Sequence, residues 1–475
     1  MNGRTSHINL LNGPTEANQD EIIASLKPGS SLFSQLEAIA KPSSHEGRDT
    51  EKGNLITNIH YDGKSYYWPR ENGPGYLKFT LTDTKRELRR MGRTNKPGAK
   101  ENLSEVDEII SDINRNRYVD WAGPLAGHRC GLIKDTKSGQ QLLVTNEPRL
   151  LIPTPGDFPT IETFITDLLC DQTRWFLAWM SSSLRNLVEF MDEKALFQPA
   201  PAVALCGPRN CGKTLLIEII ATIFGRRQSA YNWMVGNTNF NSELIGAELL
   251  TCDDESGHTD MRMRKQMGNR IKSSLFSGAV KGEEKGKEAF TVRPWWRLVI
   301  ATNDEPEDLR ILPPYDDSML DKLSMFKCYR HEIVMPDATQ TERWAQIEAE
   351  IPAFMYDLLH KFVIPQEMKD RRTGAKAYQH PDLVGAIAAM DPANKLLQQI
   401  DEAMKARLPG EFTASEVERL LTDQSAPTVY EAKRLLTYSN TCGTYLSRLA
   451  HTNPDRVTIT STAGGINKYR ITLNF

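Results

Sequence analysis

Residues 202–214 read AVALCGPRNCGKT, an apolar run followed by a glycine-rich turn, and the apolar stretch LLIEIIATIFG comes next. The turn matches the pattern G-x-x-x-x-G-K-[ST] in full, and a strand before it with a helix after it is the context that this pattern requires. Glycines allow the backbone to curl so that its N–H groups face a phosphate, while the helix adds its positive end. These residues therefore predict a phosphate-binding loop in an α/β fold.

Two side chains in the turn add specific chemistry. Lys213 can reach the β- and γ-phosphates of a nucleotide, and the hydroxyl of Thr214 can bind Mg²⁺. We therefore expect ATP and Mg²⁺ as ligands. The predicted nucleotide-binding residues are Gly207, Pro208, Arg209, Asn210, Cys211, Gly212, Lys213 and Thr214.

An acidic cluster follows the next apolar strand, in ELLTCDDE at residues 248–255. Ligands of open α/β sheets bind at the carboxyl ends of the strands, so these acids are expected beside the loop. Asp253 is predicted to hold the water shell of the magnesium ion, and Asp254 to orient or deprotonate the attacking water. If the acids are shifted by one residue relative to the end of the strand, Glu255 takes the role of Asp254. The alternative interpretation is that this acidic cluster is only a solvated loop.

A third apolar strand, RLVIATN at residues 297–303, ends in Asn303. Its amide is placed to hydrogen-bond the γ-phosphate or the attacking water, although an Asn after a strand is also a common turn former. Strands that alternate with helices along this part of the chain indicate a parallel α/β sheet.

These motifs, in this order and at this spacing, resemble those of superfamily 3 helicases of the AAA+ class. That family combines Walker A, Walker B, a B′ hairpin and a motif C that ends in Asn, here from Gly207 to Asn303. The resemblance implies an ATPase and DNA helicase that hydrolyses ATP between the subunits of a homo-oligomeric ring. In this family the ring is a hexamer that translocates on single-stranded DNA.

The same resemblance implies a hairpin in the ring channel, formed by the segment between the Asp pair and Asn303. A loop of Gly and Lys residues brings mobile charges to a phosphate backbone without demanding a base sequence. Two acidic residues in this loop, Glu283 and Glu284, favour a merely solvated loop instead. The predicted DNA-binding residues are Lys272, Lys281, Lys285 and Lys287.

Many family members carry an arginine pair after motif C, which acts on the nucleotide of the neighbouring subunit. Here the matching region reads Asp321-Lys322-Leu323, and a lysine is a point charge and not a planar fork. The residue that reaches the nucleotide of the neighbouring subunit is called the finger. Lys322 is one candidate for it, with Arg310 and Arg330 as alternatives. The predicted catalytic residues are Lys213, Asp253, Asp254, Asn303, Arg310 and Lys322.

The last part of the chain resembles a winged helix. FTASEVERLL at residues 412–421 opens with Thr413 or Ser415 as its cap, TCGTYLSRLA at 441–450 is the expected recognition helix, and VTITSTAGGINKYRI at 457–471 is the expected wing. We expect contact with duplex origin DNA, with a protein partner as the alternative. The side chains expected to face outward or to lie near phosphates are Thr444, Ser447, Arg448, Lys468 and Arg470.

Residues from about 160 to 475 resemble primase-helicase proteins of phages, prophages and their satellites, for example in ILPPYDDSMLDKL and YQHPDLVGAIAAMDPANKLLQQID. Earlier in the chain, residues 54–80 predict a small antiparallel element, and residues 103–115 an amphipathic helix with Leu103 on its apolar face. No acidic pair typical of a primase stands out there. A basic run with few nearby acids is a candidate nucleic-acid surface, formed by Lys85, Arg86, Arg89, Arg90, Arg93, Lys96 and Lys100.

The composition excludes several classes of protein. The chain has 475 residues, 39% of them hydrophobic, so it is not wholly disordered. Its net charge is -3, so any DNA-binding surface must be local. It lacks a long apolar run and a signal peptide, and its seven cysteines form no CxxC pair, which together predict a cytoplasmic protein of a bacterial host cell without a membrane partner.

Four regions are expected: an α+β N-terminal region at 1–155, an AAA+ helicase core with its preceding helix pair at 156–345, a helical connector at 346–395 and a winged helix at 396–475. The predicted function is that of an ATP-dependent replicative DNA helicase of a mobile genetic element. The alternatives are an origin-binding initiator whose ATPase controls assembly, and an AAA+ regulatory switch that acts on a protein partner.

Overall fold

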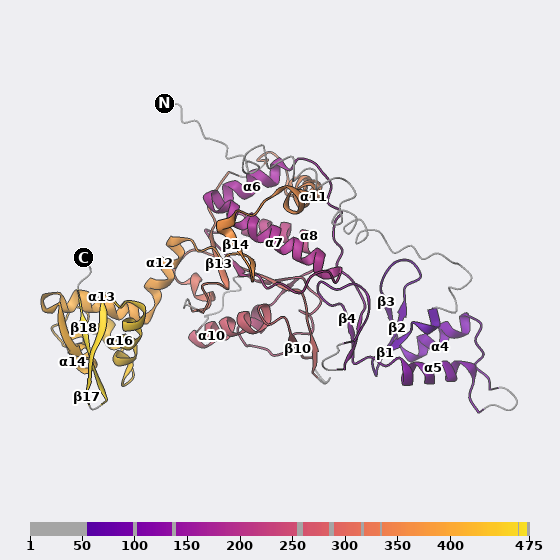
Figure 1. Ribbon diagram of the computed structural model, residues 1–475, viewed down its shortest axis with the longest axis horizontal. Coiled ribbons are helices and arrows are strands. Elements are labelled where there is room, and N and C mark those ends of the chain that lie inside the picture. Colours follow the sequence, from indigo (N-terminus) through magenta and orange to yellow (C-terminus); the bar gives the residue numbers. More distant parts are fainter. Residues whose placement is uncertain are drawn as a thin grey trace. The chain divides into compact units, whose positions relative to one another are not determined.

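The computed structural model describes residues 55–97, 102–134, 139–253, 260–284, 289–314, 318–332, 335–463 and 465–472. The chain forms two compact units, of which the first ends at Gln379 and the second begins at His380 (Figure 1). The finer division into four regions stays a prediction.

The first unit is built around a five-stranded sheet in the order β13-β7-β12-β9-β8, with every neighbouring pair parallel. Three of its strands are buried along their whole length, which is why they read as continuous apolar runs in the sequence. The predicted parallel α/β sheet is confirmed. Its strands are β7 (Ala202–Cys206), β8 (Arg227–Ser229), β9 (Leu249–Cys252), β12 (Arg297–Thr302) and β13 (Leu323–Lys327).

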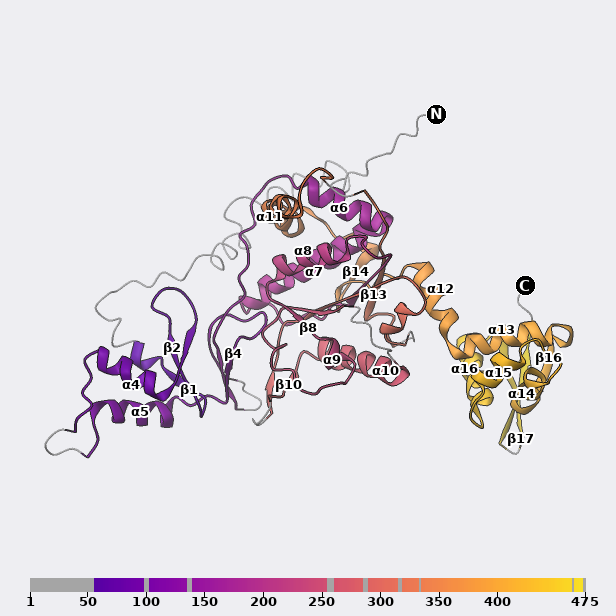
Figure 2. The same cartoon turned by 180° about the vertical axis from the view of Figure 1, so that it is seen from behind.

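Helices cover both faces of this sheet, as the two opposite views in Figures 1 and 2 show. One face carries α6 (Pro159–Leu169), α7 (Thr173–Met191), α8 (Lys213–Phe224) and α11 (Gln340–Tyr356). The other face carries α9 (Tyr231–Met234) and α10 (Met261–Arg270). None of the helices in the described ranges is long and apolar enough to cross a membrane.

A chain of aromatic rings joins α7 to α8 and to the segment before β12. The ring of Trp179 lies 6.1 Å from that of Phe176 and 5.9 Å from that of Phe224, centroid to centroid. Phe224 in turn lies 5.4 Å from Trp295. All four side chains are buried, and burial of each contributes about 1.5–3 kcal/mol to folding. The core of the unit therefore lies directly beneath the helix that follows the glycine-rich turn.

Two small sheets and two helices form the first part of this unit. The antiparallel element predicted for residues 54–80 is present as β1 (His60–Tyr61), β2 (Tyr66–Pro69) and β3 (Tyr76–Phe79). Helices α4 (Leu81–Arg90) and α5 (Glu105–Asn116) accompany it. The expectation for Leu103 was wrong, because α5 begins after the cap residue Ser104 and Leu103 is 49% exposed. A second small sheet has the order β4-β6-β5, with β4 (Trp121–Gly123), β5 (Gly131–Lys134) and β6 (Gln141–Val144).

Two further sheets of the first unit consist of two antiparallel strands each. One is formed by β11 (Phe290–Val292), which pairs antiparallel with β10 (Val280–Gly282). The other pair is β14 (Lys369–Asp370) and β15 (Gly374–Ala375).

The second unit has its own core, which includes Leu396, Ile400, Val417 and Leu446. Its helices are α12 (Pro381–Met390), α13 (Pro392–Met404), α14 (Ala414–Thr422), α15 (Val429–Leu435) and α16 (Thr441–Thr452). Its antiparallel sheet has the order β16-β18-β17, with β16 (Gly410–Thr413), β17 (Val457–Ala463) and β18 (Ile466–Ile471). The sequence indicated two of these strands but not β16.

Candidate functional site

The glycine-rich turn leaves β7 at the carboxyl edge of the sheet. The backbone N–H of Gly207 donates to the carbonyl of Thr302, at 3.2 Å, so the turn starts beside the end of β12. A Cβ atom on Gly207 would lie 2.3 Å from the carbonyl oxygen of Cys328. Only glycine fits here, because the chain that leaves β13 passes directly against the turn.

The turn then closes through two residues with left-handed backbone. Asn210 has φ 63° and Gly212 has φ 109°, and a Cβ on Gly212 would also lie 2.8 Å from the ring of Phe164. Left-handed residues interspersed in a turn direct successive N–H groups into a concave surface that suits an anion. Helix α8 begins at the next residue, Lys213, so its positive end points into the same place.

Lys213 lies inside the turn that precedes it. Its ammonium group donates to the carbonyl of Gly207 at 2.6 Å and to that of Pro208 at 2.9 Å. The hydroxyl-bearing Thr214 is exposed in the first turn of α8, and Arg209 and Asn210 are exposed at the tip. The predicted nucleotide-binding residues thus form one continuous loop around the Lys213 ammonium.

Two cysteines at the base of the loop, Cys211 and Cys328, form a hydrogen-bonded pair. The thiol of Cys328 hydrogen-bonds Cys211 and, with the Lys213 ammonium, lowers the pKa of Cys211, while burial opposes this effect. The same contact raises the pKa of Cys328. Cys211 is therefore the thiolate-forming partner and Cys328 the donor. The carbonyl of Cys211 also contacts Nε2 of His331 at 3.1 Å.

Asp253 follows β9 at the same edge of the sheet. The last residue of β9, Cys252, pairs with Ile300 of the parallel strand β12, so Asp253 emerges at the carboxyl edge as predicted. Its carboxylate accepts from the guanidinium of Arg227 at 3.1 Å, and Arg227 also pairs with Glu218 on α8. The other two acids of the predicted cluster, Asp254 and Glu255, lie outside the described residues.

Asn303 stands between these two features. It follows Thr302, which pairs with Cys206 at the end of β7, so Asn303 and Gly207 leave neighbouring strands at the same level. Its amide nitrogen donates to the carboxylate of Asp308 at 2.9 Å, which fixes the orientation of the side chain. The order of strands therefore places Asn303 between the loop and Asp253.

The three finger candidates lie in different places. Arg310 is exposed in a 3₁₀ turn, Asp308–Ile311, at the carboxyl edge of the sheet, and Arg330 is exposed beyond the end of β13. Lys322 precedes β13, and its carbonyl accepts from the N–H of Ala202 at the start of β7. It therefore lies at the amino edge of the sheet, away from the loop of its own chain.

The Lys322 ammonium is already engaged where it lies. It pairs with Asp321 at 2.5 Å and lies 5.5 Å from the ring centroid of Phe276. Arg372 approaches the same two residues, at 3.5 Å from Asp321 and 5.1 Å from the Phe276 ring.

The hairpin of β10 and β11 is present, with residues 285–288 at its tip outside the described ranges, among them Lys285 and Lys287. Its first strand is held by Asn241, whose side chain donates to the carbonyl of Lys281 at 2.9 Å and accepts from the N–H of Glu283 at 2.8 Å. The Lys281 side chain is exposed. Lys272 lies in the turn after α10, where its ammonium contacts the hydroxyl of Ser318.

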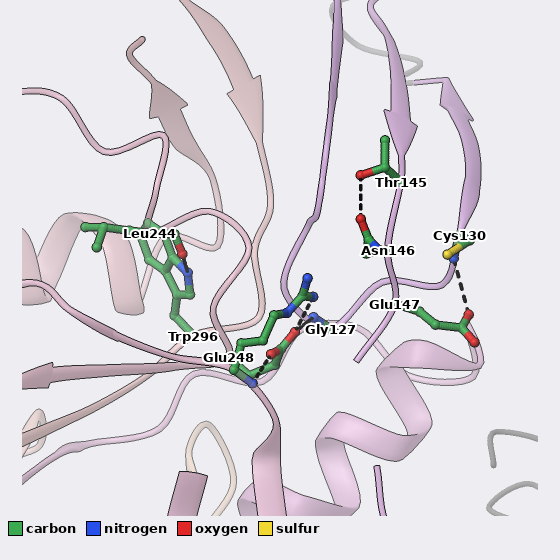
Figure 3. A network of polar contacts seen from close by, with 9 residues as sticks. Gly127, Cys130, Thr145, Asn146, Glu147, Leu244, Glu248 and Trp296 are labelled. Carbon is green, nitrogen blue, oxygen red and sulfur yellow. Dashed lines mark hydrogen bonds and ion pairs between the residues drawn. The ribbon is translucent and has the colours of Figure 1, made fainter. Parts of the chain in front are cut away.

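A buried carboxylate ties an earlier segment to the sheet (Figure 3). Glu248 is fully buried and accepts from the N–H of Gly127 at 3.2 Å and from the N–H of Arg226 at 2.8 Å. The guanidinium of Arg226 also lies 3.2 Å from this carboxylate. Next to it, Ala126 accepts from the N–H of Trp295 at 3.0 Å.

The basic run on α4 has more acidic partners than its sequence indicates. Lys85 pairs with Asp107 at 2.8 Å, and Arg93 pairs with Glu105 at 2.6 Å, both acids coming from α5. Within α4, Asp83 pairs with Arg86 and Glu87 with Arg90. The charge that the run offers to a partner is correspondingly reduced.

In the second unit, the predicted contact residues are only partly on the surface. Ser447 hydrogen-bonds the hydroxyl of Tyr469 at 2.7 Å, so it is turned toward β18 and is only partly exposed. Arg448 is exposed but pairs with Asp391 at 2.8 Å, and Arg470 pairs with Glu411 at 2.7 Å. Thr444 and Lys468 are exposed as expected. The cap of α14 is Thr413, in a capping box with Glu416, and not Ser415.

Sequence reasoning missed Arg227, Asp308 and His331. Each contacts a predicted site residue across a strand or turn boundary, and Arg227 could have been found only if the pairing of β8 with β9 were known. Among the residues that the structure describes, no group of three His, Cys, Asp or Glu side chains could hold a metal ion. A divalent cation here would therefore depend on Thr214, Asp253 and the phosphates of a nucleotide, which is a donor set of oxygens that suits magnesium.

The model of a family of unknown function, DUF5906, matches residues 205–318, the part that carries the loop, β9 and β12. The apo structure of the NrS-1 C-terminal region (305–718) superposes with a TM-score of 0.52 at 13% sequence identity, over 89% of this chain and 98% of that one. The A-form apo structure of the same region superposes over the same shares with a TM-score of 0.51 at 13% identity. No curated protein sequence matches. The likeness shows a shared fold.

Proposed function

We propose that this chain is an ATP-driven DNA helicase of the superfamily 3 AAA+ type that unwinds DNA during replication of a mobile genetic element. One observation carries the proposal. The Gly207–Thr214 loop, Asp253 and Asn303 leave three strands of one parallel sheet at the same edge, with β12 between β7 and β9. A phosphate-binding loop, a carboxylate and a polar amide are the groups that phosphoryl transfer to water needs.

Each of these side chains has a separate task in the proposed hydrolysis. Lys213 and the loop N–H groups bind the β- and γ-phosphates, and Thr214 with Asp253 would hold magnesium, which neutralises charge on those phosphates. Asn303, oriented by Asp308, hydrogen-bonds the attacking water or the γ-phosphate. Asp254 orients or deprotonates that water, with Glu255 as the alternative.

DNA translocation is proposed on separate grounds. The β10–β11 hairpin carries Lys281 on the described strand, and Asn241 holds that strand by two hydrogen bonds. In a homo-oligomeric ring, a hexamer by resemblance, this hairpin would grip single-stranded DNA by backbone charge. A finger from the neighbouring subunit would complete the site, and exposed Arg310 and Arg330 are better placed for it than the engaged Lys322. The proposed place of action is the cytoplasm of a bacterial host.

The test compares Lys213→Ala with Arg174→Ala, an exposed basic residue on α7. The first change should abolish ATP hydrolysis and unwinding of forked DNA, because the lost contact is to phosphate, while far-UV circular dichroism stays the same. The control should keep both activities. Normal steady-state ATPase activity in Lys213→Ala would refute the assignment of the loop.

A second candidate is an origin-binding initiator whose ATPase controls assembly. The observation that favours it is the separate core of the second unit, with its helices and the β16-β18-β17 sheet in the order expected for a winged helix. Footprinting on duplex DNA together with a strand-displacement assay separates the two. Protection of a duplex site without unwinding would favour the initiator, and ATPase activity without either would favour a regulatory switch.

A further inference from the structure

The two most exposed aromatic side chains in the described part of the chain belong to the second unit. Tyr430 is 87% exposed and Tyr438 is 78% exposed, whereas the next aromatic residue, Phe240, is 53% exposed. Tyrosine rings usually bury most of their surface, since each carries a large apolar face. Neither ring packs on the core of its own unit.

Both rings lie on the same stretch of chain. Ala432 is fully buried, so the helical period places Tyr430, Lys433 and Arg434 on the opposite, outer side of α15. Tyr438 lies in the turn between α15 and α16. Its carbonyl accepts from the backbone N–H of Thr441 at 3.2 Å and from the Thr441 hydroxyl at 2.7 Å. We name this surface the tyrosine face: Tyr430, Lys433, Arg434 and Tyr438.

The charges of the tyrosine face are available to a partner. Lys433 and Arg434 are exposed and form no ion pair with any residue that the structure describes. Elsewhere in this unit, Arg448, Arg456 and Arg470 are each paired with a carboxylate. The acid on α15 itself, Glu431, lies beside the tyrosine face and leaves it with a net positive charge.

We propose that the tyrosine face is a binding site for single-stranded nucleic acid. Two accessible rings offer stacking platforms for unpaired bases, and the two cations that lie between them in the sequence match the phosphates that join those bases. A duplex would present its backbone and the edges of its bases but no free base face, because its bases are stacked on one another. The site goes beyond the proposed function, since it lies in the second unit, shares no residue with the β10–β11 hairpin or the nucleotide loop, and needs no ATP.

The first experiment locates the contact directly in the full chain. A 15-nucleotide single strand that contains 5-bromodeoxyuridine is irradiated with the protein in the absence of ATP, and the cross-linked peptides are identified by mass spectrometry. We expect cross-links at Tyr430 or Tyr438. Tyr118, which is 46% exposed in the first unit, serves as the comparison tyrosine.

The second experiment measures affinity for a fluorescein-labelled oligothymidylate by anisotropy. The double change Tyr430→Ala and Tyr438→Ala should weaken binding by about tenfold or more, because two stacking contacts are lost. The pair Tyr430→Phe and Tyr438→Phe keeps both rings and should bind within about twofold of the wild type. Lys433→Ala with Arg434→Ala should lower the slope of log affinity against log salt by about 1.4, from about 0.7 for each phosphate contact.

Unchanged melting curves of these surface variants would establish that their folding is intact. The proposal is overturned if the alanine pair binds single strands as the wild type does and no cross-link falls within residues 429–440. It is also overturned if the alanine pair loses only duplex affinity, or only self-association in sedimentation, since the face then serves duplex DNA or a second copy. Lys213→Ala should keep the cross-link, so a failed ATPase assignment and a failed tyrosine face give different results.

Discussion

The guanidinium of Arg227 lies 3.1 Å from the carboxylate of Asp253 and also pairs with Glu218. Arg227 begins β8, Asp253 follows β9, and Glu218 belongs to α8, the helix that starts at Lys213. One side chain thus connects the acidic edge of the sheet with the helix behind the nucleotide loop. Arg227 is a positioning residue for Asp253 under the proposed function.

Replacing Arg227 with Met should lower ATPase turnover by about 10- to 100-fold, the usual cost of removing a partner that orients a metal-binding group. Arg227→Lys should recover part of the loss, because it restores charge but not the two-pronged contact. The stability cost should stay at about 1 kcal/mol or less, since the pair is partly exposed. Measured kcat and KM with a magnesium titration would check this. Wild-type kcat and KM values in Arg227→Met would show that Asp253 does not depend on Arg227 for its position.

Gly207→Ala should destabilise the first unit by about 1–3 kcal/mol, because the added Cβ would overlap the carbonyl of Cys328. Gly268→Ala is the matched control, since its Cβ would meet nothing nearer than 3.4 Å and α10 gains up to about 1 kcal/mol from alanine. Urea unfolding followed by tryptophan fluorescence suits both, because all eight tryptophans precede residue 345. Equal urea midpoints of Gly207→Ala and Gly268→Ala would contradict the close approach of residue 207 to the carbonyl of Cys328.

The Cys211 thiol should ionise below the ordinary thiol pKa of about 8.5. Because the folded-state pKa is lowered, the thiolate is present above that lowered pKa and is lost as the pH falls through it. The stabilisation that the thiolate contributes to folding is complete above about pH 8.5, and it is lost as the pH falls through the lowered pKa of the folded state. The difference in thiolate absorbance near 240 nm between wild type and Cys211→Ser would reveal the transition. Cys442→Ser should show none near neutral pH, since burial raises the pKa of Cys442 to about 12.

Asn241→Ala should uncouple DNA unwinding from ATP hydrolysis. The change removes the two side-chain hydrogen bonds to the first strand of the hairpin, at Lys281 and Glu283, but keeps the backbone bond from the N–H of Asn241 to the carbonyl of Glu283 and touches no residue of the nucleotide loop. We expect unwinding of forked DNA to fall at least tenfold while basal ATPase activity remains within about twofold, as each lost hydrogen bond to a buried group costs about 1–3 kcal/mol locally. Asn237→Ala, an exposed neighbour, is the control. Equal losses of both activities would mean that Asn241 supports the whole unit.

The sequence predicts the loop, the acidic strand end and Asn303 because each depends on a short run of residues whose backbone demands are local. Gly207 and Gly212 belong to this class, since their spacing already encodes the turn. The contact between Arg227 and Asp253 does not, because it depends on which strands are neighbours in the sheet. The partial neutralisation of the basic run could not be predicted for the same reason, since Glu105 and Asp107 reach it from another helix. Ser447 is only partly exposed because it contacts Tyr469, which comes from a strand 22 residues away.

The buried Glu248 carboxylate determines how far the chain can be shortened from its N-terminal side before the central sheet loses stability. A chain that began after Gly127 would retain Glu248 and Arg226 but lose a neutral donor to a fully buried acid, at a cost of about 1–3 kcal/mol. Trp295 would lose its backbone acceptor at Ala126 as well. A shortened or fused chain would therefore have to keep the segment that carries Ala126 and Gly127 for the sheet to retain its stability. The unit that folds together is longer than the stretch from the glycine-rich turn to Asn303 that carries its sequence motifs.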